Sequence, residues 1–219
     1  MTSDTWFRAF IDADVLAAPL TRTLLILCGT HPRGRFAPRW SLAVECEAER
    51  HLRPGQTSLT RLRARFDWAD HVIVAAADPA SAMDFADTDA DDRHVLAAAA
   101  QAGITVVVSR NVSDFGRTDL EARNMAVVHP DLFLTAVVDE SVYREVLDQI
   151  SLGRSREPRS AGSIHSAIAR QHPLFFDKMA AVFPDVEPDG TVHGPPGEMI
   201  RGAKGVGAVF RAALREWSN

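Results

Sequence analysis

Short apolar runs and amphipathic segments alternate along the first two thirds of the chain. Apolar runs at residues 7–15, 71–77, 104–109 and 125–128 have the length and character of buried parallel strands. Helical periodicity predicts helices at 19–29, 41–52, 58–68, 91–101, 114–124 and 130–138. Ser41, Ser113 and Pro130 are their expected starts, with Asp89 or Asp91 as the expected cap of the fourth. This alternation predicts a three-layer α/β/α sandwich with a mainly parallel central sheet, ending near residue 138.

Two stretches before residue 92 lack a clear pattern. Residues 31–39 are rich in Pro, Gly and Arg and are predicted to form a loop, and residues 78–92 are too polar for a helix or a strand.

Beyond residue 138 the strand signals stop. Four further segments have helical patterns, at 140–152, 163–172, 174–183 and 203–217. The sequence therefore predicts a sheet domain at 1–138 and a helical C-terminal extension at 139–219. Because the extension has strongly apolar helix faces, we expect it to pack on the sheet domain and to support a homodimer.

Composition narrows the functional classes without deciding among them. The 219 residues carry a net charge of −5, which argues against an extended basic coat, yet arginines dominate 33–65 and 144–170, so RNA binding stays open. No 18-residue uncharged apolar run occurs, and Cys28 and Cys46 have no metal-ligand spacing. We expect a soluble cytoplasmic protein with buried, reduced thiols and no membrane partner.

Four acidic residues lie at the ends or beginnings of predicted elements: Asp12, Glu47, Asp92 and Asp114. The carboxyl edge of a parallel sheet is the usual position of a functional site, and neighbouring strands at 7–15 and 104–109 would bring three of these acids to that edge. Buried carboxylates repel one another unless they are protonated or bridged by a cation. The acids therefore predict a site for Mg²⁺ or Mn²⁺.

Three of these acids have simpler explanations when each is considered alone, whereas Asp12 at the end of a strand is the least easily explained in that way. Glu47 borders the apolar stripe of its helix, where Arg50 or Arg53 would be a suitable partner. Asp92 and Asp114 lie in first helical turns, where the helix dipole favours aspartate in any protein. The choice of Glu47 over Glu45 depends on a helix start at Ser41.

The order and details of these stretches resemble the PIN domain, and more narrowly the PIN-like toxins of VapC type. The matching stretches cover about 7–134 and read FIDADVL, SLAVECEAERHL, DADDRHVLAAAAQAGI, SRNVSDF and VVHPDLFL. The resemblance implies cation ligands at Asp12, Glu47, Asp92 and Asp114, with Ser109 and Asn111 as supporting polar neighbours. Many relatives have an acid where this chain has Asn111, so weaker cation binding is expected here.

The resemblance also implies an activity and partners. It implies cleavage of single-stranded RNA by a Mg²⁺- or Mn²⁺-dependent endoribonuclease, as the toxin of a type II toxin–antitoxin system with a cognate antitoxin. Such a cation lowers the pKa of bound water and stabilises the leaving oxygen. Arg93 and Arg110 lie beside the acids and are candidates for contacts to substrate phosphates.

Two other functional classes use some of the same residues. In a haloacid dehalogenase-like phosphatase, Asp12 would be the nucleophile and Asp14 the acid/base. That class needs a lysine and then an acidic pair after the serine, whereas here the acidic pair at 91–92 precedes Ser109 and the next lysine is Lys178. A receiver-type phosphoacceptor domain likewise lacks its lysine. The other alternative is a catalytically degenerate PIN fold that binds RNA or protein.

Overall fold

A six-stranded sheet forms the centre of the molecule. The computed structural model describes residues 7–66, 72–73, 79–153, 159–191 and 197–217. Within these ranges the strand order is β3-β2-β1-β4-β5-β6, with β6 antiparallel to β5 and every other pairing parallel. The strands are β1 (Phe7–Ile11), β2 (Phe36–Ser41), β3 (Val72–Ile73), β4 (Val106–Val108), β5 (Ala126–Val128) and β6 (Ile200–Gly202).

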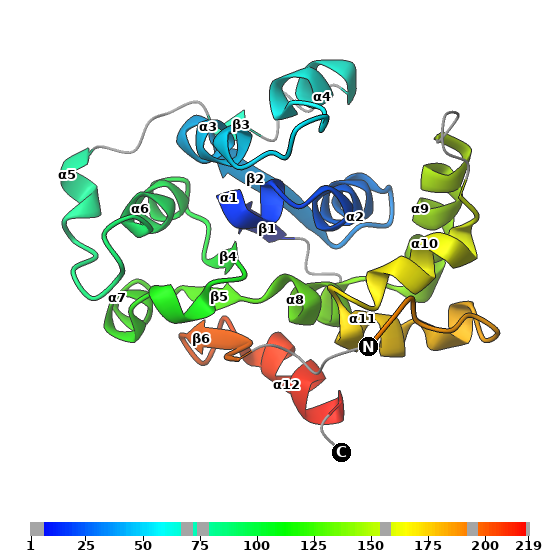
Figure 1. The fold of residues 1–219 in the computed structure, drawn as a ribbon. Helices are drawn as coiled ribbons and strands as arrows, with labels where there is room; N and C mark the ends of the chain where they lie inside the picture. Colours follow the sequence, from blue (N-terminus) through cyan, green and yellow to red (C-terminus); the bar gives the residue numbers. More distant parts are fainter. Residues whose placement is uncertain (1–6, 67–71, 74–78, 154–158, 192–196, 218–219) are drawn as a thin grey trace.

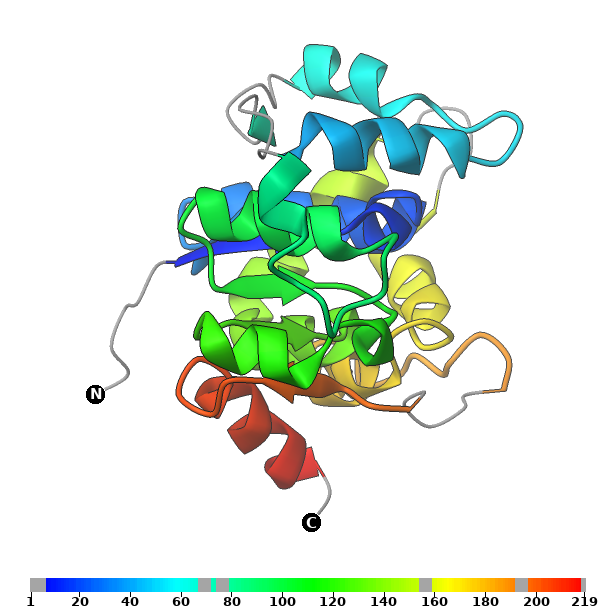
Figure 2. The same cartoon turned by 90° about the vertical axis from the view of Figure 1, so that its left-hand side faces the viewer.

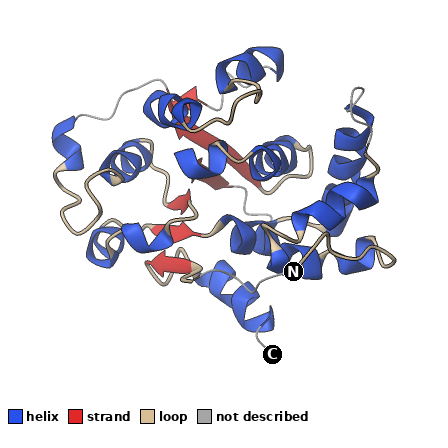
Figure 3. Cartoon of the chain, viewed as in Figure 1, coloured by secondary structure: helices blue, strands red, loops and turns tan. Residues whose placement is uncertain are grey.

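Helices cover both faces of this sheet. Figure 1 shows α6 and α7 on one side of the column of strands and α2 and α8 on the other, and Figure 2 faces the side with α6 and α7. The predicted three-layer α/β sandwich is therefore confirmed. Figure 3 shows the helices on either side of the strands. The helices are α1 (Ala13–Leu16), α2 (Pro19–Thr30), α3 (Leu42–Arg50), α4 (Leu59–Phe66), α5 (Pro79–Ala82), α6 (Arg93–Gln101), α7 (Arg117–Ala122), α8 (Pro130–Val137), α9 (Glu140–Gly153), α10 (Ala161–Ile168), α11 (Pro173–Lys178) and α12 (Ala208–Trp217), with 3₁₀ turns η2 (Val112–Asp114) and η3 (Ala180–Val182).

The central strands are apolar on both faces because helices bury both faces. Every residue of β4 and β5 is buried, as are the last three of β1, which is the pattern expected of a covered parallel sheet. Aromatic rings extend this core toward the C-terminal region: Phe133 of α8 lies 4.8 Å from Phe36 and 5.6 Å from Phe210 of α12, between ring centroids. The C-terminal region thus packs on the sheet domain, as expected.

Two strands were not predicted from the sequence. β2 lies in the stretch expected to be a loop, and Pro38 is tolerated there because β3 pairs only with Trp40 and Ser41 at the far end of the strand. β6 lies within residues 139–219, which were predicted to be helical, and it adds an antiparallel strand beside β5 at the edge of the sheet. Gly202 ends β6 at φ 102°, and an added Cβ would lie 2.4 Å from the Met125 carbonyl oxygen, so a side chain does not fit.

Other boundaries differ locally from the prediction. The apolar run at 7–15 changes from strand to helix at Asp12, whose side chain accepts a hydrogen bond from the Ala13 N–H and so begins α1. The helix predicted at 114–124 is divided into η2 and α7, and Gly116, rather than Ser113, precedes α7. The polar stretch at 78–92 contains the short helix α5.

Two predictions extend past the described residues. Of the strand predicted at 71–77, only Val72–Ile73 is described, and residues 67–68 of the helix predicted at 58–68 also lie outside the described ranges. The expectation of two buried thiols is wrong for Cys46, which is exposed on α3, whereas Cys28 is buried on α2. In the part of the chain that the structure describes, each helix is too short or too polar to cross a bilayer.

Candidate active site

The site begins where β1 and β4 end side by side. Ile11 pairs with Val108, and the Asp12 N–H donates to the Val108 carbonyl at 3.0 Å. Asp12 and Ser109 therefore follow neighbouring parallel strands at the carboxyl edge of the sheet, where a functional site is expected.

Asp12 is almost fully buried there, with 5% of its surface exposed. Its Oδ1 accepts from the Ala13 N–H at 2.6 Å. Burial, together with the charges of Asp14 and Glu47, raises the pKa of Asp12 to about 7, while hydrogen bonds from Ser109 and Ala13 oppose the shift. Near neutral pH this carboxyl is poised between its protonated and charged forms.

Asp92 is the second centre of the acidic group. It precedes α6 without making a side-chain cap bond, so helix capping does not account for it. Burial, together with the charges of Asp12, Asp114, Asp89 and Glu47, raises the pKa of Asp92 to about 7. The charges of the other three predicted acids, Asp12, Glu47 and Asp114, thus all act on Asp92.

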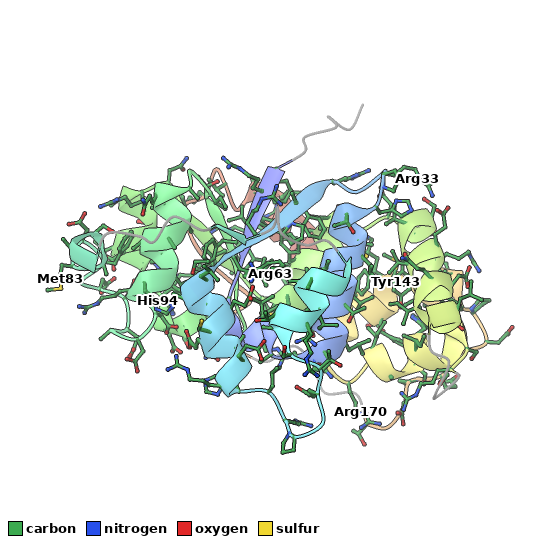
Figure 4. All side chains as sticks on the ribbon, turned by 90° about the horizontal axis from the view of Figure 1, so that it is seen from above. Arg33, Arg63, Met83, His94, Tyr143 and Arg170 are labelled. Carbon is green, nitrogen blue, oxygen red and sulfur yellow. The ribbon has the colours of Figure 1, made fainter. Side chains whose placement is uncertain are left out.

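Glu47 and Glu45 have different environments although they share α3. Glu45 is 2% exposed and accepts from the Trp40 Nε1–H at 2.9 Å, so it belongs to the packing of α3. Glu47 is partly exposed, and its Oε2 lies 3.3 Å from the Nε2 atom of His94 on α6. Figure 4 shows His94 on the side of the molecule away from the C-terminal helices that carry Tyr143. Glu47 is therefore the acid that faces the site, with His94 as the partner that sequence reasoning missed.

The loop after β4 provides the remaining predicted residues. Ser109 is fully buried, and its Oγ accepts from the Asn111 N–H at 3.1 Å. Asn111 precedes η2 without a side-chain cap bond, and Asp114 at the end of η2 is exposed. The Asp114 carbonyl accepts from the Asp89 N–H at 2.8 Å, which holds this loop against the loop that leads to Asp92.

The two arginines proposed to contact phosphate have different roles. Arg93 donates through Nε to the Thr88 carbonyl at 3.0 Å and through Nη2 to the Ala86 carbonyl at 3.2 Å, so it shapes the loop before α6.

Arg110 lies at the acidic edge and is partly exposed. Its Nη2 donates to Gln171 Oε1 at 3.0 Å and to Thr21 Oγ1 at 3.2 Å. This network joins the turn after α10 to the acidic edge, and local patterns do not predict it because Gln171 lies 61 residues from Arg110.

Asp14 is an acid of the site that the sequence placed only in the phosphatase alternative. Its Oδ2 accepts from the Arg110 N–H at 2.9 Å, and its Oδ1 is buried without a hydrogen-bond partner among the described residues. Burial raises the pKa of Asp14 to about 6, opposed by the hydrogen bond and charge of Arg110. Its spacing two residues after Asp12 was the only available sequence signal.

The donor chemistry of this edge fits a hard divalent cation. Carboxylate oxygens are the protein ligands that Mg²⁺ and Mn²⁺ prefer, and a cation would offset the repulsion that raises the pKa values of Asp12 and Asp92. In the described ranges, no group of three or more His, Cys, Asp or Glu side chains is already arranged as a ligand set. Cation binding would therefore require these carboxyl groups to move closer together.

Comparison with known proteins gives one partial similarity. The chain is 33% identical over 103 residues to a Mycobacterium tuberculosis protein named "Putative ribonuclease VapC50", and the aligned part covers 45% of this chain and 60% of that relative. The chain thus spans less than two thirds of the relative's length. No family model and no solved structure matches the chain.

Proposed function

We propose that this chain is a divalent-cation-dependent endoribonuclease of the PIN type. The main support is that the charges of Asp12, Asp114 and Glu47 all act on Asp92, although these residues lie on separate segments of the chain. The partial similarity to a protein named as a ribonuclease supports the same reaction class.

The residues of the acidic edge would divide the work of hydrolysis. Asp12 and Asp92 would hold the cation, with Glu47 and Asp114 near them. When bound, a cation of this kind lowers the pKa of a ligated water and stabilises the leaving oxygen of the phosphodiester. The Ser109 hydroxyl orients Asp12, and Arg110 carries a positive charge at the same edge for a neighbouring RNA phosphate.

The biological setting belongs to the proposal as well. Single-stranded RNA is the proposed substrate, and a toxin with a cognate antitoxin is the proposed context, both from the resemblance to VapC-type proteins. The proposed homodimer rests only on the apolar character of the C-terminal helices, and light scattering over a wide concentration range tests it.

Cleavage of a labelled single-stranded RNA tests the proposed activity. We expect the purified full chain to cut the RNA with Mg²⁺ or Mn²⁺ and to stop when EDTA is added. Asp92→Asn should abolish cleavage, whereas the control Asp91→Asn removes an exposed neighbouring charge and should retain it. Cleavage by Asp92→Asn at the wild-type rate would refute the assignment.

One observation favours a second candidate, a degenerate PIN fold that binds RNA without cutting it. In the described ranges, the acids form no ready ligand set. The resemblance to the PIN family also implies an acid at the position where this chain has Asn111. Tight RNA binding that is insensitive to Mg²⁺, with no cleavage of any RNA, would favour this candidate. The phosphatase alternative has little support because Lys178, its nearest downstream lysine, donates to the Thr135 and Val138 carbonyls at the end of α8.

A further inference from the structure

Asp14 has one buried carboxylate oxygen whose hydrogen-bonding capacity is unused. Oδ2 accepts from the Arg110 N–H, whereas Oδ1 is shielded from solvent and has no hydrogen-bond partner among the described residues. The backbone N–H of Val15 lies close enough to lower the pKa of Asp14, but it forms no hydrogen bond to Oδ1. A buried, unpaired carboxylate oxygen is unfavourable, so its presence calls for a ligand or a specific explanation.

The hydrogen bond to Arg110 does not explain why this residue is an aspartate. An asparagine amide oxygen would accept from the same N–H without burying a charge. The Arg110 guanidinium is held by Thr21 and Gln171, and no ion pair between it and Asp14 is present in the described part of the chain. The backbone bond fixes the orientation of the carboxylate and leaves Oδ1 available.

Asp14 also belongs to the acidic edge by position. It lies in the first turn of α1, two residues after the capping residue Asp12. Its charge acts on Asp12, and the charge of Asp92 acts on it in turn. The free oxygen is therefore within electrostatic reach of both residues proposed to hold the cation.

We infer that Asp14 is a further cation-binding carboxylate, which supplies Oδ1 to the divalent ion proposed at Asp12 and Asp92. This inference rests on the proposed function, because it needs a cation at that edge. It assigns the Arg110 N–H the role of positioning the Asp14 ligand.

Calorimetric titration of the metal-free full chain with Mn²⁺ tests the inference without an activity readout. Asp14→Asn keeps the acceptor for Arg110 and the side-chain shape but removes the charge, and we expect Mn²⁺ affinity to fall at least about tenfold. The control Asp91→Asn removes one exposed charge near the site and should change affinity less than about threefold, because solvent screens exposed charges. Thermal unfolding in EDTA shows whether each variant is folded.

The possible results separate the inference from the proposed function. Equal Mn²⁺ affinity of wild type and Asp14→Asn would overturn the role of Asp14 and leave the cation site intact. Equal losses of Mn²⁺ affinity in Asp14→Asn and Asp91→Asn would also overturn it, because the loss of any nearby negative charge would then account for the effect. Absence of Mn²⁺ binding by the folded wild type would overturn both. If Asp14→Asn fails to fold, Asp14→Ser, which lacks the charge but is small and polar, replaces it in the same titration with the same expected loss.

Discussion

The buried aspartates of this molecule belong to two kinds of environment. Asp131 on α8 is fully buried, and its two oxygens accept from the Leu174 and Phe175 N–H groups at 3.1 and 2.9 Å. It thereby caps the beginning of α11 from a distant part of the chain. At the acidic edge, by contrast, Asp12 and Asp92 lie among other carboxyl groups.

Burial alone does not separate these two environments. Burial raises the pKa of Asp131 to about 7, as it does for Asp12 and Asp92. The difference lies in the partners: two backbone N–H groups donate to Asp131 and the charge of Asp177 contributes least to its shift, whereas the charges of at least two other acids act on each of Asp12 and Asp92. A carboxylate with backbone donors stabilises the fold, whereas clustered carboxylates destabilise it unless a cation binds.

Neutralising an acid at the edge should give the largest effect on activity. We expect Asp12→Asn or Asp92→Asn to reduce RNA cleavage by more than the roughly 10–100-fold that loss of an outer-shell metal partner causes. Metal-free stability should stay equal or rise, because repulsion between carboxylates is removed. Initial rates and unfolding curves in EDTA measure both. If either variant kept full activity, or were unfolded in EDTA-containing buffer without denaturant, the distinction between the acidic edge and Asp131 would be wrong.

The opposite result is expected at the capping aspartate. Asp131→Ala leaves the Leu174 and Phe175 N–H groups without their acceptor, which should lower the free energy of unfolding by roughly 2–3 kcal/mol. The folded variant should keep its cleavage rate. Urea denaturation measures the loss, and Asp131→Asn, which retains one acceptor oxygen, should lose less than the alanine variant.

The pH dependence of metal-free stability sharpens the comparison further. The pKa of Asp92 is about 7 in the folded state against an ordinary 3.8, so the folded state retains a proton that the unfolded chain releases. This contribution favours folding at low pH and is lost as the pH rises through about 7. Asp92→Asn lacks it, so its melting temperature relative to wild type should rise between about pH 4 and about pH 7 and stay level above that.

Two buried histidines also change the stability of the protein with pH. Burial lowers the pKa values of His129 and His172 to about 4 and about 3, which makes stability rise with pH in the acidic range. Their contribution is common to both proteins and cancels in the difference. A difference in melting temperature that stays constant with pH would contradict the raised pKa of Asp92.

The smallest expected effect concerns the contact between the two parts of the chain. Gln171→Ala removes one acceptor for the Arg110 guanidinium, while Thr21 remains. We expect KM for RNA to rise about two- to threefold with kcat unchanged, because one exposed hydrogen bond contributes about 0.5 kcal/mol. Steady-state kinetics measure it, with the exposed Gln101→Ala as control. An unchanged KM would show that Arg110 does not need this support.

Local patterns predicted much of this fold because the strands β1, β4 and β5 are short, apolar and covered on both sides. β2 and β6 were missed for a physical reason: each is specified by its neighbours in the sheet, and Pro38 or Gly202 hides it in the sequence. Their formation depends on tertiary pairing, which local propensity does not contain.

The candidate site was predictable to a similar degree. Asp12 and Asp92 could be proposed from the sequence because they lie at the end of a predicted strand and the beginning of a predicted helix, which a parallel sheet brings together at one edge. Asp14, His94 and Gln171 were not assigned to the site, because their importance comes from a free oxygen, an ion pair and a long-range bond, which only coordinates reveal.

The central claim is that the acidic edge binds a divalent cation, and anomalous diffraction from a crystal grown with Mn²⁺ tests it most directly. The account predicts a Mn²⁺ peak about 2.1 Å from carboxylate oxygens of Asp12 and Asp92. A wild-type crystal saturated with Mn²⁺ that shows no peak between these residues, or shows its ions only elsewhere, would contradict it.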